Sequence, residues 1–288
     1  MPNRLTAARA ADITDGATPV KPGRRRLRQA AIALTALLAL AWLTDHLLPP
    51  PIPDAGAGGA SLVLARDGRP LRAFADREGV WRYPVRVDEV SPLYIEALLG
   101  YEDRWFWRHP GVNPLSVLRA AGQWIRHGRS VSGASTLSMQ VARIIEPQPP
   151  GLWGKLRQTL RALQLEWRLD KREILELYLN HAPFGGPIEG VEAASWAYLG
   201  KPAARLSHAE AALLAVLPQA PSRLRPDRHP ERARAARDKV LRRLAEFAIW
   251  PTGVLDEARA ENVVARSLSV PQYAALFAER LHGEHPGQ

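Results

Sequence analysis

The sequence predicts a mainly α-helical protein with a small β-hairpin region near its N-terminus and one N-terminal transmembrane helix. Residues 29–44 run without a single charge. Leu and Trp recur at spacings of 3 and 4 between Trp153 and Trp167, which is the period of an amphipathic helix. Only residues 61–87 are typical of short strands, because SLVLA and PLRAF flank an Asp-Gly turn signal.

The uncharged run predicts a membrane-spanning helix over residues 29–48. Such a helix would be roughly 30 Å long, enough for a hydrocarbon core. Seven basic and two acidic residues precede it, which favours a cytoplasmic tail over 1–28 and translocation of the chain after residue 48. Two alternatives stay open, a buried soluble helix and a signal peptide cleaved near Ala55-Gly56-Ala57.

Composition divides the remaining chain into a linker, a main domain and a C-terminal segment, and capping signals mark where helices start. A Pro/Gly/Ala linker over 49–60 precedes the main domain at 61–250, and 251–288 predicts one or two further helices. The stretch 218–230 holds four prolines and predicts a loop. Four residue pairs mark helix starts, namely Ser91-Pro92, Asn113-Pro114, Asp170 with Glu173, and Ser207 with Glu210.

The net charge and the residue types limit which binding partners and which kinds of catalytic site the chain can have. The 39 Lys and Arg against 29 Asp and Glu give a net charge of +10, and only five of the 39 are Lys. Such a chain binds nucleic acid, anionic membrane or a phosphate-bearing substrate, and export argues against nucleic acid. The absence of Cys excludes disulfides and a Cys nucleophile, and no Ser-x-x-Lys or His-Glu-x-x-His motif occurs.

Glu102 and Asp103 form the first candidate catalytic cluster, within the sequence EDRWFWRHPG. A carboxylate held against aromatic rings loses hydration, which raises its pKa and suits it to general acid or base work. The alternative is a solvated acid pair at a helix C-terminus. The same pattern also describes the acid of a glycosidase, so it does not fix the reaction class.

Three further clusters carry candidate residues. The second cluster predicts a helix with Thr136, Gln140 and Arg143 on one face, after a Gly/Ser-rich start that can bind a phosphate. The alternative is a helix of small residues that packs tightly in the core. We interpret the helix from Trp153 as a surface helix with its apolar stripe in the core; the sharper alternative has Lys155 and Arg157 lining a site for an anionic leaving group. The segments 174–180 and 183–190 are interpreted as a structural helix and a loop.

In order and spacing, EDRWFWRHPG, GASTLSMQ, KLRQTLRALQLE and ILELYLN resemble glycosyltransferase family 51, the peptidoglycan glycosyltransferases. ASWAYLGK and the segment LAVLPQAPSRLRPDRHPERA are most similar to the N-terminal part of class A penicillin-binding proteins of the 1C type. The sequence ends where their transpeptidase domain would begin. The resemblance implies a lysozyme-like fold in the periplasm, anchored in the bacterial inner membrane.

The resemblance also implies the reaction. Lipid II would be polymerised with inversion and release of undecaprenyl pyrophosphate, with Glu102 as general base and Asp103 in support. The implied partners are lipid II, the growing glycan, membrane lipid and other cell-wall synthases, but not nucleic acid. No cofactor is required, although Mg²⁺ at the pyrophosphate is compatible. The implied substrate-binding residues are Phe106, His109, Ser135, Thr136, Gln140, Arg143, Lys155, Arg157 and Gln158.

Four departures from the family pattern bear on the site. Met139 replaces the first Gln of the usual pair, Arg143 replaces a Lys, and Gly154 replaces the Arg before Lys155. The usual second Glu of the third motif is Gln158, which weakens a two-carboxylate scheme and leaves Glu166 as a substitute candidate. Two alternatives to the polymerase therefore stay open, a lysozyme-like hydrolase and a non-polymerising scaffold that binds lipid II.

Overall fold

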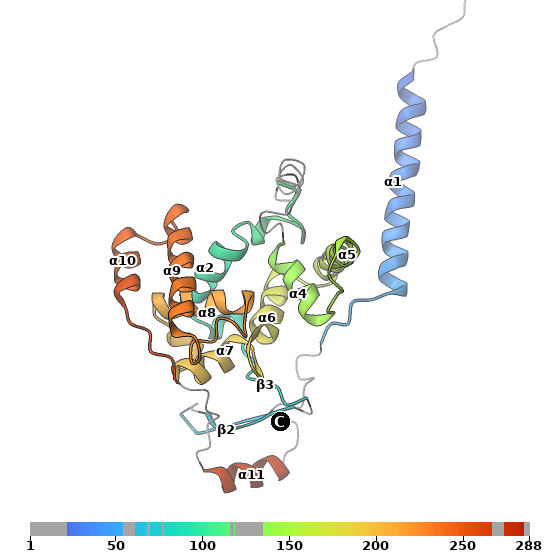
Figure 1. Ribbon diagram of the computed structural model, residues 1–288. Coiled ribbons are helices and arrows are strands. Elements are labelled where there is room, and N and C mark those ends of the chain that lie inside the picture. The colour runs from blue at the N-terminus through green and yellow to red at the C-terminus, as the bar shows by residue number, and fades with distance from the viewer. Residues whose placement is uncertain are drawn as a thin grey trace, which may run out of the picture. The chain divides into compact units, whose positions relative to one another are not determined.

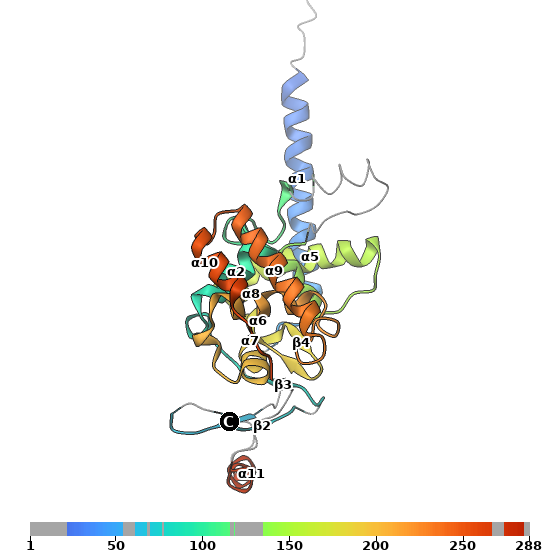
Figure 2. The ribbon, with the colours of Figure 1, turned by 60° about the vertical axis from the view of Figure 1, so that its left-hand side comes forward.

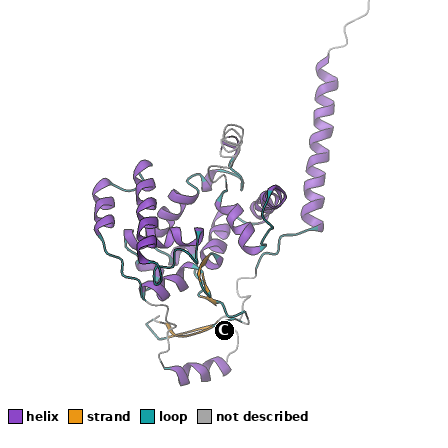
Figure 3. Ribbon diagram, in the orientation of Figure 1, coloured by secondary structure: helices purple, strands orange, loops and turns teal. Residues whose placement is uncertain are grey.

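The computed structural model describes residues 22–53, 61–67, 70–76, 78–115, 118, 135–266 and 274–284. It divides at Pro49 into two units, a single helix and the remaining domain. The described residues are mainly helical, with a few short strands, which confirms the predicted class (Figure 1, Figure 3). The α-helices are α1 Pro22–Leu47, α2 Pro92–Glu102, α4 Leu137–Ile145, α5 Leu152–Arg168, α6 Lys171–His181, α7 Val191–Ala194, α8 His208–Val216, α9 Pro230–Glu246, α10 Thr252–Ala260 and α11 Ala275–Glu284.

Helix α1 is longer than predicted. It starts at Pro22 rather than Gln29, because the basic residues before the apolar run are good helix formers. The stretch Arg26–Leu47 has a mean hydropathy of 1.6 and is long and apolar enough to cross a membrane, by length and composition. Most of the predicted linker lies outside the described residues.

The strands form two small sheets. β1 (Ser61–Leu64) pairs antiparallel with β2 (Pro70–Phe74), as predicted, and α11 packs on this hairpin. β5 (Ile188–Glu189) lies between β3 (Trp81–Arg82), to which it is parallel, and β4 (Pro183–Gly185), to which it is antiparallel. The interpretation of 183–190 as a loop was therefore wrong. Gly185 and Gly186, which both have positive φ, allow the tight reversal between β4 and β5.

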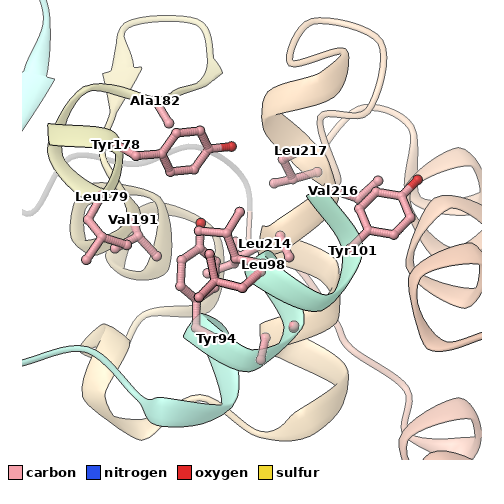
Figure 4. Close-up of a cluster of buried hydrophobic side chains, with 14 of the residues drawn as sticks. Tyr94, Leu98, Tyr101, Tyr178, Leu179, Ala182, Val191, Leu214, Val216 and Leu217 are labelled. Carbon is pink, nitrogen blue, oxygen red and sulfur yellow. The ribbon is translucent and has the colours of Figure 1, made fainter. Parts of the chain in front are cut away.

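Helix α8 is the centre of the core. Every residue of Ala211–Val216 is buried, and the helix packs against α2, α9 and α10 (Figure 2). Its small alanines allow close approach of the neighbouring helices. Figure 4 shows Leu98 of α2 beside Leu214 of α8 in this cluster. Because α2 is fixed in the core, the residue at its C-terminal end has a fixed position.

The capping signals are confirmed where the structure describes them. Asp170 with Glu173, and Ser207 with Glu210, each form a capping box in which side chain and backbone exchange hydrogen bonds. Ser91 precedes α2 with Pro92 at its first position. Pro114 is helical as predicted, but most residues from 116 to 134, including Ser132 to Ala134, lie outside the described part of the chain.

Candidate active site

Glu102 is the last residue of α2 and the centre of the site. Gln140 Nε2 of α4 donates a hydrogen bond to Glu102 Oε2, and Gln219 Nε2 donates one to Oε1, both at 2.7 Å. Gln219 ends the 3-10 turn Leu217–Gln219 that follows α8. The two amides from two different elements therefore fix both oxygens of one carboxylate.

The electrostatics of Glu102 combine opposing effects. Burial raises the pKa of its carboxyl, whereas the amides of Gln140 and Gln219 and the charge of Arg243 lower it. Burial is the largest of these, so the pKa lies above its ordinary value. A carboxylate that is partly desolvated yet held by neutral donors suits a general base.

Asp103 joins the first two motifs through hydrogen bonds to Leu137 and His109. It is the C-cap residue after α2, and its Oδ2 accepts the backbone N–H of Leu137 at 2.8 Å, which satisfies a free donor at the start of α4. His109 Nε2 lies 2.9 Å from the same oxygen. Both side chains are buried, so Asp103 and His109 hold the start of α4 in place beside the end of α2 rather than line an exposed surface.

Phe106 and Thr136 are two further buried residues that help to position the site. Phe106 is fully buried, with the Lys171 ammonium 4.5 Å from its ring centroid. Thr136 is the N-cap of α4: its hydroxyl accepts the Met139 N–H and donates to the Gly111 carbonyl. The structure therefore brings the first two motifs together, as the resemblance implied, but it buries these two side chains.

A cationic cluster lies along α4 and α5. Lys155 Nζ donates to Ser135 Oγ and, at 3.1 Å, to Gln158 Oε1. Burial, and then the charge of Arg143, lower the pKa of Lys155. Gln158 is buried and its Nε2 donates to the Met139 carbonyl at 2.6 Å. An amide at 158 therefore joins α5 to α4 and leaves the charge of Lys155 available to an anion.

Two expectations about α5 need correction. Arg157 is not directed at this cluster: with Arg161 it forms an ion pair with Glu146, and it is half exposed. Glu166 does not replace the missing carboxylate at Gln158, because its Oε1 binds Ser138 and Lys171.

The predicted burial of the apolar stripe on α5 was wrong. The helix instead buries the small residues Gly154 and Ala162, the amide of Gln158, and Leu165. Trp153 and Trp167, at the two ends of the stripe, are 73% and 69% exposed. Leu156, Leu160 and Leu163 between them are also exposed. Periodicity identified the helix correctly but not which of its faces contacts the core.

Gly154 explains one departure from the family pattern. A Cβ at this position would lie 2.0 Å from the Pro149 carbonyl oxygen, so any side chain requires the backbone to move. We expect Gly154→Ala to lower the free energy of unfolding by about 1–3 kcal/mol. Gly253 of α10 is the matched control, because its Cβ would meet nothing within 4 Å; Gly253→Ala should stabilise by up to about 1 kcal/mol. Thermal melting measures both, and equal shifts would contradict the contact.

Gln219 and Arg243 were missed by the sequence analysis. Gln219 lies in a proline-rich stretch that was predicted to be a loop and was cited for its similarity to the 1C type without a role for Gln219, and Arg243 lies on the basic helix α9, outside the quoted motifs. Each reaches Glu102 through a long-range contact of the fold, for which the sequence carries no local signal.

The comparisons with known proteins identify the family. The family profile described as Transglycosylase matches residues 67–245, more than half of the chain. The chain belongs to this transglycosylase family. Over 254 residues it is 57% identical to penicillin-binding protein 1C of Escherichia coli (strain K12), covering 88% of this chain and 33% of that protein. Penicillin-binding protein 1A of Aquifex aeolicus (strain VF5) is 40% identical over 190 residues, 66% of this chain and 26% of that protein.

Among solved structures, penicillin-binding protein 1A from Haemophilus influenzae aligns with 79% of this transglycosylase chain and 24% of its own, at 23% identity and a TM-score of 0.43. The chain thus spans about a third of the length of its curated 1C relative and about a quarter of the 1A relatives. The predicted resemblance to the N-terminal part of a class A penicillin-binding protein is confirmed.

Proposed function

We propose that this transglycosylase is a peptidoglycan glycosyltransferase that polymerises lipid II, a disaccharide-pentapeptide on undecaprenyl pyrophosphate. The observation that supports the proposal is a partly desolvated carboxylate in the same domain as a cationic cluster. Glu102 is a desolvated carboxylate fixed by two amides, and the cluster of Lys155 and Arg143 lies on the neighbouring elements. One environment accepts a proton, and the other stabilises a leaving anion.

In the proposed reaction, Glu102 removes a proton, and Lys155 and Arg143 stabilise the leaving group. Glu102 accepts the proton of the acceptor sugar's 4-hydroxyl as its oxygen attacks the anomeric carbon of the growing chain. The bond from that carbon to the pyrophosphate oxygen breaks, and its electron pair leaves on the pyrophosphate. Attack opposite the leaving group inverts the anomeric centre. Lys155 and Arg143 stabilise the developing charge, so the leaving group needs no proton from the enzyme.

A bound metal is not part of this scheme. Within the described residues there is no group of three or more His, Asp or Glu side chains arranged to hold one. The neutral amide of Gln158 accepts a hydrogen bond from Lys155 and donates one to the Met139 carbonyl. Every step above uses side chains of the chain itself, and Mg²⁺ carried by the pyrophosphate, which needs no such group of protein ligands, is compatible with it.

Incubation of the full chain with lipid II in detergent tests the proposed function. We expect glycan polymer and release of undecaprenyl pyrophosphate. Binding of lipid II without turnover would support the scaffold alternative instead, and cleavage of existing glycan strands would support the hydrolase.

We also propose that the protein is anchored in the bacterial inner membrane with its domain in the periplasm, and that α5 touches lipid. The evidence is the length and composition of α1 and the exposed stripe of α5. Trp at both ends of an apolar stripe, with basic residues beside it, is typical of a helix that lies in a membrane interface.

A dye on α5 tests this membrane contact. Because the chain has no Cys, Leu160→Cys allows labelling of the full chain at one site with an environment-sensitive dye. On reconstitution into anionic vesicles, its emission should shift to the blue and be quenched by lipid-borne quenchers. Arg172→Cys on α6, which is exposed but carries no apolar stripe, should show neither change. Equal behaviour of the two dyes would contradict the lipid contact.

A further inference from the structure

The side-chain amide of Gln219 bridges the last two residues of α2. Its Nε2 donates to Glu102 Oε1 at 2.7 Å, and its Oε1 accepts a hydrogen bond from the Tyr101 hydroxyl, with 3.3 Å between the two oxygens. Both ends of the amide are therefore occupied, one by the proposed base and the other by the residue before it in the sequence. The proposed reaction uses Glu102 but gives Tyr101 no role.

The backbone of Gln219 is held firmly although its side chain is exposed. Leu217 and Pro218, the other two residues of its 3-10 turn, are buried, and the turn contacts α8 and β4. The proline ring also fixes φ within the turn. Tyr101, on the last turn of α2, is buried as well (Figure 4). An exposed glutamine loses side-chain entropy when it is fixed, and two hydrogen bonds to α2 offset that loss.

The hydrogen bonds of this chain all donate toward Glu102. An ionised carboxylate only accepts, so it meets the N–H end of the amide, which leaves the amide oxygen to accept from the Tyr101 hydroxyl. Hydrogen bonds aligned in this way strengthen one another. A donor also stabilises an ionised carboxylate more than a neutral carboxyl. The contacts of Tyr101 and Gln219 therefore favour the form of Glu102 that is ready to accept a proton.

Four other titratable groups act on Glu102 or respond to it. The charge of Arg243 on α9 lowers the pKa of Glu102, and that of Asp103 raises it. Tyr94 of α2 and Tyr178 of α6 are fully buried; burial is the main cause that raises the pKa of each, and the charge of Glu102 adds to it. All four groups stay in place when Gln219 is changed, so they do not alter a comparison between variants.

We propose that Gln219 is a positioning residue for the general base and that Tyr101 acts through it. Together the two side chains hold the Glu102 carboxylate at its Oε1 atom, as Gln140 holds it at Oε2. This inference rests on the proposed function, because it concerns the base of that reaction. The effect of both residues on the rate passes through Glu102 and should therefore depend on pH.

The pH dependence of polymerisation tests Gln219. Gln219→Met keeps the length of the side chain but removes the donor, so protonated Glu102 becomes more favourable and the acid limb of the kcat profile should move to higher pH. On that limb, the rate relative to the variant's own plateau should fall about three- to tenfold, the effect of one hydrogen bond that water partly replaces. Gln219→Glu adds a like charge and should move the limb further in the same direction.

Tyr101→Phe tests whether the hydroxyl acts through the amide. Alone, it should move the acid limb in the same direction by less than Gln219→Met does. Added to Gln219→Met it should change nothing further, because its acceptor is gone, and a double-mutant cycle measures this. Tyr198→Phe is the matched control, since Tyr198 is also buried but donates to the Phe184 carbonyl at 2.9 Å instead. It should lower the melting temperature and leave the acid limb in place.

Infrared titration reports the same effect without substrate. The band of the protonated Glu102 carboxyl, assigned by its loss in Glu102→Gln, should appear at higher pH in Gln219→Met than in wild type. An unchanged acid limb and band in Gln219→Met, additive effects of Tyr101→Phe, or an equal shift in Tyr198→Phe would overturn the inference. The proposed function fails separately: a band that shifts as expected in a chain that makes no polymer from lipid II would leave the role of Gln219 intact and contradict the polymerase.

Discussion

Replacing Glu102 with Gln should lower the rate of polymerisation by about 100- to 10,000-fold, the usual effect of losing a general base. This corresponds to about 3–5 kcal/mol of activation barrier. A sugar hydroxyl is a poor nucleophile until its proton is removed, and among the residues that the structure describes no other carboxylate shares the contacts of Glu102 with Gln140 and Gln219. Glutamine keeps the size of the side chain but cannot accept the proton. The measurement is polymer formed per enzyme from lipid II.

Folding should survive this change. Burial raises the pKa of Glu102, so the folded state favours the neutral carboxyl, and the ionised form costs stability at pH 7. That cost grows as pH rises from the unfolded value through the folded one, and Gln removes it. We therefore expect the melting temperature at pH 7 to stay the same or rise. If Glu102→Gln keeps more than about a tenth of wild-type turnover, Glu102 is not the base.

The second large effect concerns Lys155. Lys155→Met removes a half-buried charge that is held by Ser135 and Gln158 and is not neutralised by a carboxylate in the described part of the site. A positioned charge that stabilises the leaving group in the transition state typically contributes about 100- to 1,000-fold in kcat. The measurement is the steady-state rate of undecaprenyl pyrophosphate release.

Arg157→Met is the matched control for Lys155→Met. It removes a charge two residues away on the same helix, but Arg157 is paired with Glu146 and half exposed. Its effect on kcat should stay within about fivefold, because an exposed ion pair contributes about 1 kcal/mol or less. Equal losses in the two variants would show that the net charge of α5, rather than the position of Lys155, stabilises the leaving group.

The sequence predicted correctly those features that are determined by short segments of the chain. The capping boxes at Asp170 and Ser207, the hairpin around Asp67 and the apolar run of α1 are confirmed because each is set by residues within a few positions of one another. The approach of Glu102 to Gln140 was expected only through the resemblance, since the motifs are far apart in sequence.

What the sequence did not predict depends on tertiary contacts. The stripe of α5 has the same periodicity whether it faces the core or the outside, and the structure buries Gly154 and Gln158 because they allow close contact with the neighbouring backbone. Gln219 and Arg243 reach Glu102 only because α8 and α9 pack beside α2. Long-range placements of this kind leave no local pattern in the chain.

Chemical rescue tests the central claim that Glu102 removes a proton. Glu102→Ala leaves space beside Gln140 and Gln219, where a small carboxylate such as formate can bind. Added formate should restore part of the turnover of Glu102→Ala, should not restore Glu102→Gln, whose side chain fills the space, and should leave the melting temperature of both unchanged. Equal rates with and without formate in Glu102→Ala, together with substantial activity in Glu102→Gln, would contradict the role of Glu102 as the base.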